Sequence, residues 1–258
     1  MKTFIVPPVI VPPPETSYET SYTARSGECD PDGFLRFSAL CDYLQETAAD
    51  HAFKTGFGKG CDGIPENITW VLTRLRVELE RYPAWRDEVV TLTFPRGMRK
   101  LFAYRDFELS LANGEVIGRA ASEWMVVDMA TRRAQRVPEK IAAYGNTVRA
   151  PALGEAPFGK FEFGDGIGEG GRTVSTRKEF TAQRSHIDVN GHVNNVRYFE
   201  WMLETAPDAM KRPLSFEAVF RAEVLEGETV VSECVCGNGA AYLKISANGK
   251  ESVIARIK

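Results

Sequence analysis

The fold is decided by a polar turn that runs directly into an apolar helical stretch, Ser185-His186-Ile187-Asp188-Val189-Asn190-Gly191-His192-Val193-Asn194-Asn195-Val196-Arg197-Tyr198. Asp188 and Asn190 are turn-forming residues, and Gly191 frees the backbone for a tight turn. Polar residues at this density are unusual for a plain surface turn when large aromatic residues follow at once. We therefore interpret this stretch as a candidate functional site.

The same pattern occurs earlier in the chain, at a constant offset of 158 residues from Thr23 to Thr181. Seven residues match without a gap: Thr23, Ala24, Asp30, Gly33, Glu46, Thr47 and Ala48 pair with Thr181, Ala182, Asp188, Gly191, Glu204, Thr205 and Ala206. A register that superposes strand, turn and helix is best explained by internal duplication. We expect two copies of one unit, consisting of a strand, a turn, a long helix and an antiparallel sheet.

The first copy shows this order of elements most clearly. A strand is predicted at 18–25, followed by a turn at 30–33. Apolar residues from Phe37 to Ala52 have helical spacing, with Ser38 or Asp30 as the expected cap, and the helix should end near Gly56. Alternating residues predict strands at 74–80, 90–94, 103–111 and 116–129, and Asn113-Gly114 is a strong hairpin signal. This order indicates an α+β fold with the helix packed on a curved sheet.

The second copy follows a change in composition. Residues 145–174 are rich in glycine and proline and are predicted to be a linker. After the second helix, strands are expected at 218–224, 229–236, 241–247 and 252–257. The predicted organisation is therefore a Pro-rich arm at 1–17, a first domain at 18–144, the linker at 145–174 and a second domain at 175–258.

Composition excludes several classes of protein. The chain has 258 residues, 43% of them hydrophobic, which is ample for a buried core. The formal charge of −3, from 32 basic and 35 acidic residues, gives no global field for nucleic acid or an anionic membrane. Apolar runs are too short to cross a bilayer, and early prolines and glutamates argue against a signal or transit peptide. We expect a cytoplasmic protein.

Five cysteines lie at positions 29, 41, 61, 234 and 236. The odd number and the lack of a C-x-x-C motif argue against a disulfide framework. Cys234 and Cys236 share one face of a predicted strand, where a metal or redox pair is less favoured than two small buried side chains.

His192 is one of three histidines in the chain and is the best candidate for chemistry. An imidazole accepts protons near neutral pH and suits a general base. Asp188 can fix its tautomer or orient water, and the Asn190 amide can donate to an oxygen where negative charge develops. These parts fit attack on a carbonyl carbon. The first copy has Asp32 and Phe34 where the second has Asn190 and His192, so we expect one catalytic half and one half that shapes a pocket.

The combined motifs resemble the acyl-acyl carrier protein thioesterases of plants and bacteria, and we expect the bacterial type. The residues that carry the resemblance are Asp188-x-Asn190-x-His192-Val193-Asn194-Asn195, Tyr198, Trp201, Leu203-Glu204-x-Ala206-Pro207, Thr69-Trp70-Val71-Leu72-Thr73-Arg74, Val77-Glu78, Arg81-Tyr82-Pro83-x-Trp85, Arg105-Asp106, Ala121-Ser122-x-Trp124, Thr131-Arg132-Arg133 and Pro138. They cover roughly Tyr18 to Glu223.

The resemblance implies two tandem hotdog domains, each a long helix wrapped by an antiparallel sheet. It also implies hydrolysis of the thioester between a fatty acyl chain and the phosphopantetheine arm of acyl carrier protein. We expect no cofactor and no metal. Carried over by position, the catalytic residues are Asp188, Asn190 and His192, with Glu223 as an acid on a following strand. Val224 stands where the family often has cysteine, so we expect water rather than a cysteine nucleophile to attack.

Substrate binding is assigned to the catalytic turn and to the first copy. We expect Asn194 and Asn195 to contact the substrate and Trp70, Leu40 and Leu44 to line an apolar acyl pocket. Acyl carrier protein is acidic, so a basic patch should dock it. The densest basic groups are 96–100 and 132–136.

The sequence is also compatible with other functions. A hotdog acyl-coenzyme A thioesterase is the first alternative, followed by a hotdog dehydratase and a non-catalytic acyl-thioester-binding protein. A metal site from His186, Asp188 and His192 has no standard ligand spacing. A serine-elbow hydrolase and a nucleotide enzyme lack their motifs. Either a monomer of two hotdogs or a homodimer is compatible with the duplication.

Overall fold

The computed structural model describes residues 17–59, 61, 65–137, 149–165, 167, 174–237 and 239–258. Residues 1–16 of the predicted Pro-rich arm lie outside this description. The first half contains β1 (Tyr18–Thr23), η1 (Ser26–Glu28), α1 (Phe37–Lys54), β2 (Ile68–Leu79), β3 (Glu88–Arg99), β4 (Phe102–Leu111), β5 (Val116–Asp128) and β6 (Ala134–Gln135). The second half contains β7 (Val174–Thr181), η2 (Arg184–His186), α3 (Asn195–Thr205), η3 (Asp208–Met210), β8 (Ser215–Phe220), β9 (Thr229–Gly237), β10 (Ala240–Ala247) and β11 (Lys250–Ile257).

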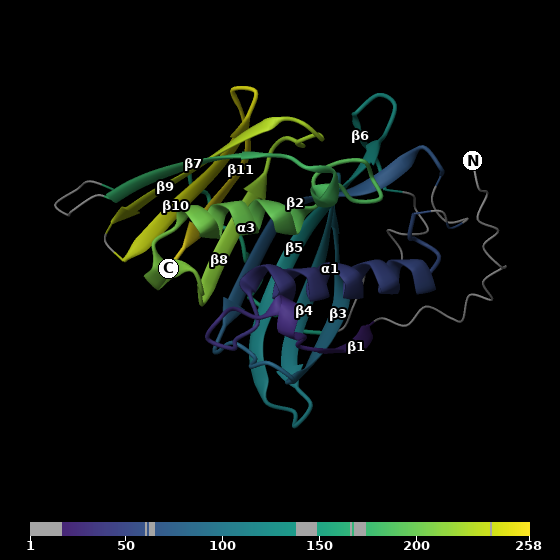
Figure 1. Cartoon of the computed structure of the whole chain (residues 1–258). Helices are drawn as coiled ribbons and strands as arrows, with labels where there is room; N and C mark the ends of the chain where they lie inside the picture. Colours follow the sequence, from purple (N-terminus) through teal and green to yellow (C-terminus); the bar gives the residue numbers. More distant parts are fainter. Residues whose placement is uncertain are drawn as a thin grey trace.

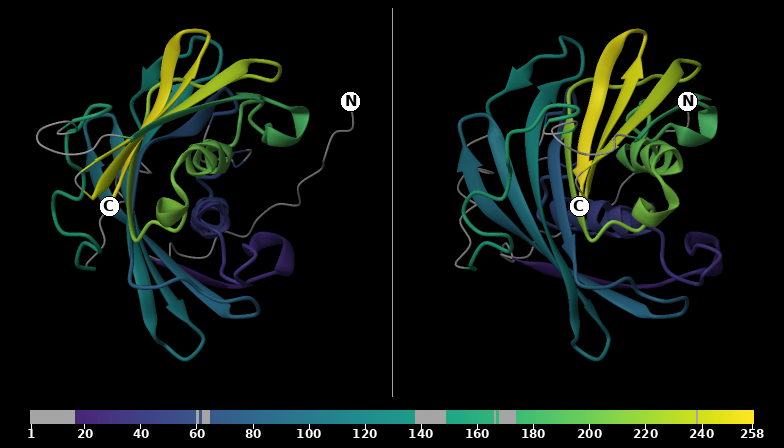
Figure 2. Two further views of the ribbon diagram at one scale, coloured as in Figure 1. Left: turned by 60° about the vertical axis from the view of Figure 1, so that its left-hand side comes forward. Right: turned by 90° about the vertical axis from the view of Figure 1, so that its left-hand side faces the viewer.

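The strands form one continuous antiparallel sheet in the order β1-β3-β4-β5-β2-β8-β11-β10-β9-β7, with β6 paired to β5. The two halves join where β2 pairs with β8, from Arg74 opposite Val219 to Glu78 opposite Ser215. The order of strands on one side of this seam repeats in reverse on the other. Both helices lie on the same face of the curved sheet (Figures 1 and 2). The predicted α+β fold is therefore confirmed.

The predicted duplication is visible in the backbone. α1 begins at Phe37 and α3 begins at Asn195, which is the same 158-residue offset that the sequence repeat shows. In each copy, the equivalent buried threonine of the helix (Thr47 or Thr205) donates its hydroxyl to the carbonyl of the residue four positions earlier. The local structure has been retained while the side chains around the turn have diverged.

Local sequence explains the element ends, with three corrections. Gly114 has a φ of 84°, and the Asn113 side chain accepts from the Glu115 N–H at 2.9 Å, as a tight hairpin requires. The N-cap of α1 is Arg36 and carries no side-chain cap bond, so neither Ser38 nor Asp30 caps it. The second helix was also expected to be long, but α3 has 11 residues against 18 in α1, because Pro207 disfavours helical geometry at the residue before it.

The third correction concerns β8, which ends at Phe220. Strand structure was expected to continue to Val224. Glu223 therefore lies in the segment after the strand rather than on it.

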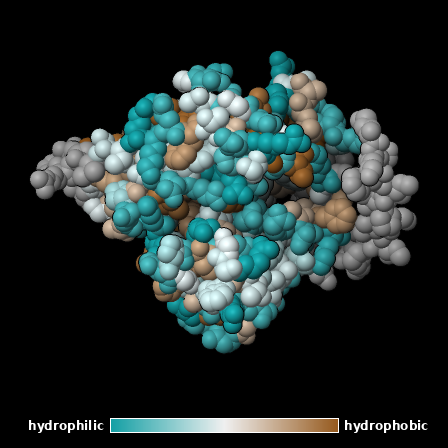
Figure 3. All heavy atoms as spheres, in the orientation of Figure 1, coloured by the Kyte–Doolittle hydropathy of each residue, from teal (hydrophilic) through white to brown (hydrophobic). Residues whose placement is uncertain are grey.

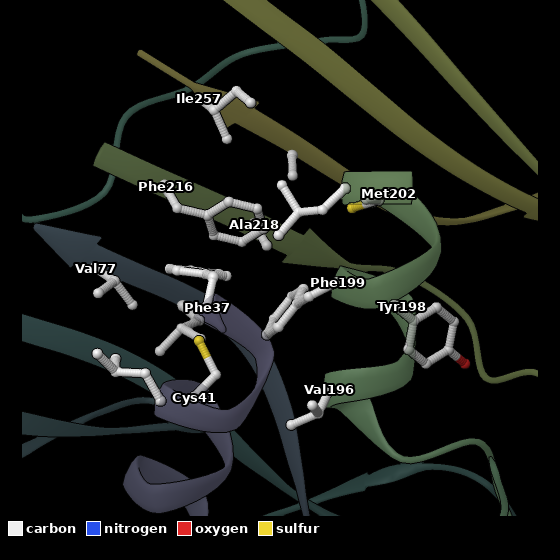
Figure 4. Packing of buried hydrophobic residues seen from close by; sticks show 14 of the residues in the cluster. Phe37, Cys41, Val77, Val196, Tyr198, Phe199, Met202, Phe216, Ala218 and Ile257 are labelled. Carbon is white, nitrogen blue, oxygen red and sulfur yellow. The ribbon is translucent and has the colours of Figure 1, made fainter. Parts of the chain in front are cut away.

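The core crosses the seam between the halves. Phe37 of α1, Phe199 of α3 and Phe216 of β8 are fully buried, with ring centroids 4.6 Å apart for Phe37–Phe216 and 4.9 Å for Phe199–Phe216 (Figure 4). Aromatic pairs at this spacing add to the stabilisation from burial. Because one cluster draws on both helices and the joined sheet, we expect the halves to fold as one unit.

The described part of the predicted linker packs on the sheet face opposite the helices (Figure 2). Arg76 Nη1 donates to the Pro157 carbonyl at 2.7 Å, and the Gly159 N–H donates to Glu217 Oε1 at 2.9 Å. Phe161 is buried beside Tyr242 and Ile254. This segment therefore covers the seam as well as connecting the halves.

No helix in the described part of the chain is long and apolar enough to cross a membrane.

Candidate active site

The turn before α3 is built by the side chains of Asp188 and Asn194. The Asn190 N–H donates to Asp188 Oδ1 at 2.7 Å, and the Gly191 N–H donates to the Asp188 carbonyl at 3.0 Å. Asn194 caps α3, since its Oδ1 accepts from the Val196 N–H at 2.9 Å. Both interactions are local, so the sequence of the turn itself fixes where Asn190 and His192 lie.

Glu223 lies beside this turn because both backbone polar groups of the next residue, Val224, are hydrogen-bonded there. The Val193 N–H donates to the Val224 carbonyl at 3.0 Å, and the Val224 N–H donates to the Tyr198 hydroxyl at 2.9 Å. Tyr198 is only 2% exposed and projects from the opposite side of α3 to Phe199 (Figure 4). Burial raises the pKa of Tyr198, so its hydroxyl stays protonated at neutral pH. Glu223 is thereby placed next to His192.

His192 and Glu223 form a pair, with 3.0 Å between Nε2 and Oε2. The His192 side chain is 21% exposed, and Glu223 is 41% exposed. Arg132, from the turn between β5 and β6 in the first half, reaches the same two atoms. Its Nη1 lies 2.8 Å from Glu223 Oε2 and 3.0 Å from His192 Nε2. The His192–Glu223 pair belongs to the second half of the chain, and Arg132 joins it from the first half.

Asn190 is oriented by a residue that follows α1. Lys59 Nζ donates to Asn190 Oδ1 at 3.0 Å and to the Val189 carbonyl at 3.2 Å. A lysine ammonium can only donate, so the amide oxygen of Asn190 must face it. The Asn190 NH₂ group then faces Asp188, with Nδ2 at 3.5 Å from Oδ2, and remains able to donate to a substrate oxygen.

An apolar cavity of about 450 Å³ lies between α1 and the sheet of the first half and reaches Val189 and Asn190. Its size is in the range of about 300–1,000 Å³ common for small-molecule sites. The lining residues are Gln45, Ala48, Ala49, Asp50, Ala52, Phe53, Thr55, Phe57, Gly58, Lys59, Thr69, Trp70, Pro95, Gly97, Met98, Ala103, Tyr104, Arg105, Trp124, Val189 and Asn190. Figure 3 shows the surface hollowed above the C-terminal part of α1, with hydrophobic side chains beside the hollow.

The cavity exists because α1 presents alanines at 48, 49 and 52 where larger side chains would fill the space. Trp70 lines it as expected, with Nε1 donating to the Phe57 carbonyl at 3.0 Å. Leu40 and Leu44 are at most 1% exposed and lie in the main core, outside the cavity lining. They pack on the inward face of α1 one to two turns before the alanines, which corrects their assignment to the pocket.

The two other predicted binding residues have defined partners. Asn194 is used as the helix cap described above. Asn195 Nδ2 donates to Gln45 Oε1 at 3.0 Å, and Gln45 lies in the cavity wall. Asn195 thus reaches the cavity through Gln45 rather than by lining it.

The thiols are poorly placed for nucleophilic chemistry. Val224, at the position where the resemblance predicts a cysteine, is 0% exposed and belongs to the hydrophobic core. Cys234 and Cys236 are buried, with their sulfur atoms 3.3 Å apart, and burial raises the pKa of Cys234. Both behave as the small buried side chains that were predicted.

His186 is occupied by local structure. Its Nδ1 accepts from the Gln183 N–H at 2.9 Å, its ring packs edge-on against Trp201, and burial lowers its pKa. Within the described residues, no three His, Cys, Asp or Glu side chains come together as a metal site would require.

The two basic groups considered for docking are partly engaged elsewhere. Arg96 is 11% exposed, lies 3.5 Å from Asp106 Oδ1 and donates to the Gly154 carbonyl at 2.8 Å. Arg132 contacts the His192–Glu223 pair. The sequence did not indicate this role of Arg132, nor the roles of Lys59 and Gln45. Each of the three contacts a partner that lies more than 50 residues away in the sequence.

Two helices on one face of a continuous antiparallel sheet define a double hotdog fold, here with a polar site at the mouth of an apolar cavity. The chain belongs to the acyl-acyl carrier protein thioesterase family. The model of the N-terminal domain of that family matches residues 15–144, and the model of the C-terminal domain matches residues 171–257.

Relatives and solved structures agree with this family. The chain is similar to a chloroplastic palmitoyl-acyl carrier protein thioesterase of Arabidopsis thaliana, at 30% identity over 86% of this chain and 57% of the relative. The chain is also similar to a chloroplastic palmitoyl-acyl carrier protein thioesterase of Gossypium hirsutum, at 33% identity over 74% of this chain and 47% of the relative. The chain thus spans about half the length of the curated relatives it matches.

Among solved structures, an acyl-acyl carrier protein thioesterase from Bacteroides thetaiotaomicron superposes with a TM-score of 0.76 at 26% identity, covering 94% of this chain and 97% of that one. A 12:0-acyl carrier protein thioesterase from Umbellularia californica has the same fold, with a TM-score of 0.81 at 24% identity, covering 95% and 97% of the two chains.

Proposed function

We propose that this protein hydrolyses the thioester of a fatty acyl-acyl carrier protein and releases the free fatty acid. The observation that carries the proposal is the position of Asn190, which lies at the mouth of the apolar cavity and two residues before His192. An acyl chain in the cavity would leave its thioester beside a hydrogen-bond donor, an imidazole and a carboxylate.

The chemistry needs only groups of the chain and one water. The Asn190 amide donates to the thioester oxygen, where negative charge develops as water adds to the carbonyl carbon. His192, paired with Glu223, takes a proton from that water. The carbon–sulfur bond then breaks, and the same proton passes to the leaving sulfur. The products are a carboxylic acid and the thiol of the carrier, so the step balances without a cofactor or a thiol nucleophile.

Acyl carrier protein is proposed as the carrier on the basis of the family and of exposed basic residues. Lys59 lines the cavity, and Arg133 and Arg136 are exposed on either side of β6, close in sequence to Arg132, which contacts the His192–Glu223 pair. These cations suit an acidic partner and the phosphate of its phosphopantetheine arm. Coenzyme A has a similar arm, so hydrolysis of acyl-coenzyme A is the alternative outcome.

Two further proposals concern the protein in the cell. We propose a cytoplasmic location for this protein, whereas the plant relatives are named as chloroplastic proteins. One chain already supplies both hotdog halves, which favours a monomer over a homodimer. Light scattering on the purified chain distinguishes the two.

The test measures thiol release from a panel of acyl-acyl carrier proteins and the matching acyl-coenzyme A esters. We expect faster release from the carrier-protein substrates and a loss of about 10²–10⁴-fold in His192→Ala. Phe34→Ala is the matched control, because Phe34 occupies the equivalent position in the first copy. Preference for coenzyme A would change the partner, and no release from either series would refute hydrolysis.

A further inference from the structure

Arg132 contacts both members of the His192–Glu223 pair although it belongs to the other half of the protein. Its Nη1, Glu223 Oε2 and His192 Nε2 form a triangle with sides of 2.8, 3.0 and 3.0 Å. The family resemblance and the basic patch pointed to Arg132 only as part of a surface motif. Its position in the structure assigns it a role in the chemistry.

The turn that carries Arg132 is held firmly by Asp128. The Arg132 N–H donates to the Asp128 carbonyl at 2.8 Å, and the Asp128 N–H donates to the Arg133 carbonyl at 3.0 Å. The Asp128 carboxylate accepts from the N–H groups of Ala130 and Thr131 at 3.0 and 2.7 Å. Arg132 has a φ of 57°, in the left-handed region that residues other than glycine rarely adopt. These bonds hold that conformation and direct the guanidinium toward the second half.

The donor and acceptor properties of the three groups restrict the state of His192. A guanidinium can only donate, and an ionised carboxylate can only accept. If Nε2 of His192 carries no proton, it can accept a hydrogen bond from Arg132. If Nε2 carries a proton, it can donate a hydrogen bond to Glu223 but cannot accept one from Arg132. Glu223 Oε2 already accepts from Arg132 at the shortest side of the triangle, 2.8 Å. The arrangement favours an imidazole that carries its proton on Nδ1 and presents a lone pair at Nε2.

We propose that Arg132 is a positioning residue of the active site, which anchors Glu223 and keeps Nε2 of His192 in the acceptor form that a general base needs. This inference rests on the proposed hydrolase function. When substrate enters, the attacking water replaces the Arg132 N–H at Nε2 and gives its proton to the same lone pair. Without Arg132, Nε2–H would donate to Glu223, and the base would be blocked.

Kinetics separate this role from carrier-protein docking. Acyl-pantetheine carries the thioester but neither the protein nor the phosphate, so docking residues do not affect it. Arg132→Ala is expected to lower kcat about 10-fold or more on both acyl-acyl carrier protein and acyl-pantetheine, with KM little changed. Arg132→Lys should recover part of kcat. The control is Arg81→Ala, which removes an exposed arginine–glutamate pair with Glu115 in another hairpin.

The tautomer of His192 gives a readout that does not require activity. The chain has three histidines, so ¹H–¹⁵N spectra of the imidazoles can be assigned with His192→Ala. His186 is an internal reference for the Nε2–H tautomer, since its Nδ1 accepts from a backbone N–H. At about pH 8, above the ordinary range of histidine titration, His192 should show the opposite, Nδ1–H tautomer. In Arg132→Ala it should change to the pattern of His186.

Three results would overturn the proposal. They are an unchanged or increased kcat in Arg132→Ala, an effect limited to KM for the carrier-protein substrate, and an unchanged His192 tautomer. Circular dichroism and the melting temperature check that the variant is folded. If the wild type hydrolyses no thioester, the proposed function fails, and the tautomer still decides whether Arg132 sets the state of His192.

Discussion

Asp188 and Asp30 make the same hydrogen bond 158 residues apart. Asp188 Oδ1 accepts from the Asn190 N–H at 2.7 Å, and Asp30 Oδ1 accepts from the Asp32 N–H at 3.0 Å. The two turns are therefore built alike, but only the second is followed by an imidazole. In the first, Arg212 Nη2 lies 2.6 Å from Asp32 Oδ2, so Asp32, which stands at the position equivalent to Asn190 of the second copy, is held in an ion pair.

This likeness provides a control within one molecule. Asp188→Ala and Asp30→Ala each remove an acceptor from a turn N–H and should each cost about 1 kcal/mol of unfolding free energy. Only Asp188→Ala should also lower kcat, by about 10²-fold, because Asn190 and His192 lose their fixed positions. Urea unfolding and thioester hydrolysis measure the two effects. Equal losses of activity in both variants would show that Asp188 acts through stability alone.

Tyr198→Phe removes the hydroxyl that accepts from the Val224 N–H. The N–H would be left buried without a partner, which costs about 1–3 kcal/mol. Because the same contact places Glu223, we also expect kcat to fall while KM changes little. Tyr43→Phe is the matched control, since it removes a part-buried hydroxyl from α1 that donates to Glu28 at 2.7 Å. A stable Tyr198→Phe enzyme with full kcat would contradict this role.

Thiol-blocking reagents should leave the activity intact. Cys29, Cys41, Cys234 and Cys236 are buried, and burial raises the pKa of Cys41 well above its ordinary value, so the reactive thiolate is disfavoured. Cys61 is partly exposed and follows the cavity-lining residues Gly58 and Lys59, so it should first be changed to serine. The rate of Cys61→Ser before and after iodoacetamide treatment is the measurement. Complete inactivation of this folded variant would revive a cysteine mechanism.

Filling the cavity should shorten the acyl chains that the protein accepts. Ala52→Leu places a larger side chain on the cavity wall formed by α1. Each methylene that no longer fits is worth about 10-fold or more in kcat/KM. We expect the longest good substrates to lose most and the shortest to change little. Glu46→Leu, on the exposed face of the same helix, is the control. A uniform loss across all chain lengths would place the acyl chain elsewhere.

Local sequence patterns predicted most of the fold. Apolar spacing predicted α1, Asn113-Gly114 predicted the β4–β5 hairpin, and the repeat from Thr23 to Thr181 predicted two copies of one unit. Each depends on interactions among residues close in sequence or on a regular period, which a sequence displays directly. The predicted cap of α1 and the predicted end of β8 were wrong, because backbone pairing and tertiary contacts determine where these elements begin and end.

The sequence by itself determined the turn that holds Asp188, Asn190 and His192, because its hydrogen bonds join neighbouring residues. Only the tertiary structure decided that Arg132 meets His192 from 60 residues away and that Lys59 meets Asn190 from 131 residues away. It likewise placed Leu40 and Leu44 in the core and left the cavity beside the alanines of α1. Such contacts depend on how the two halves pack across the β2–β8 seam, and no local pattern of residues encodes that packing.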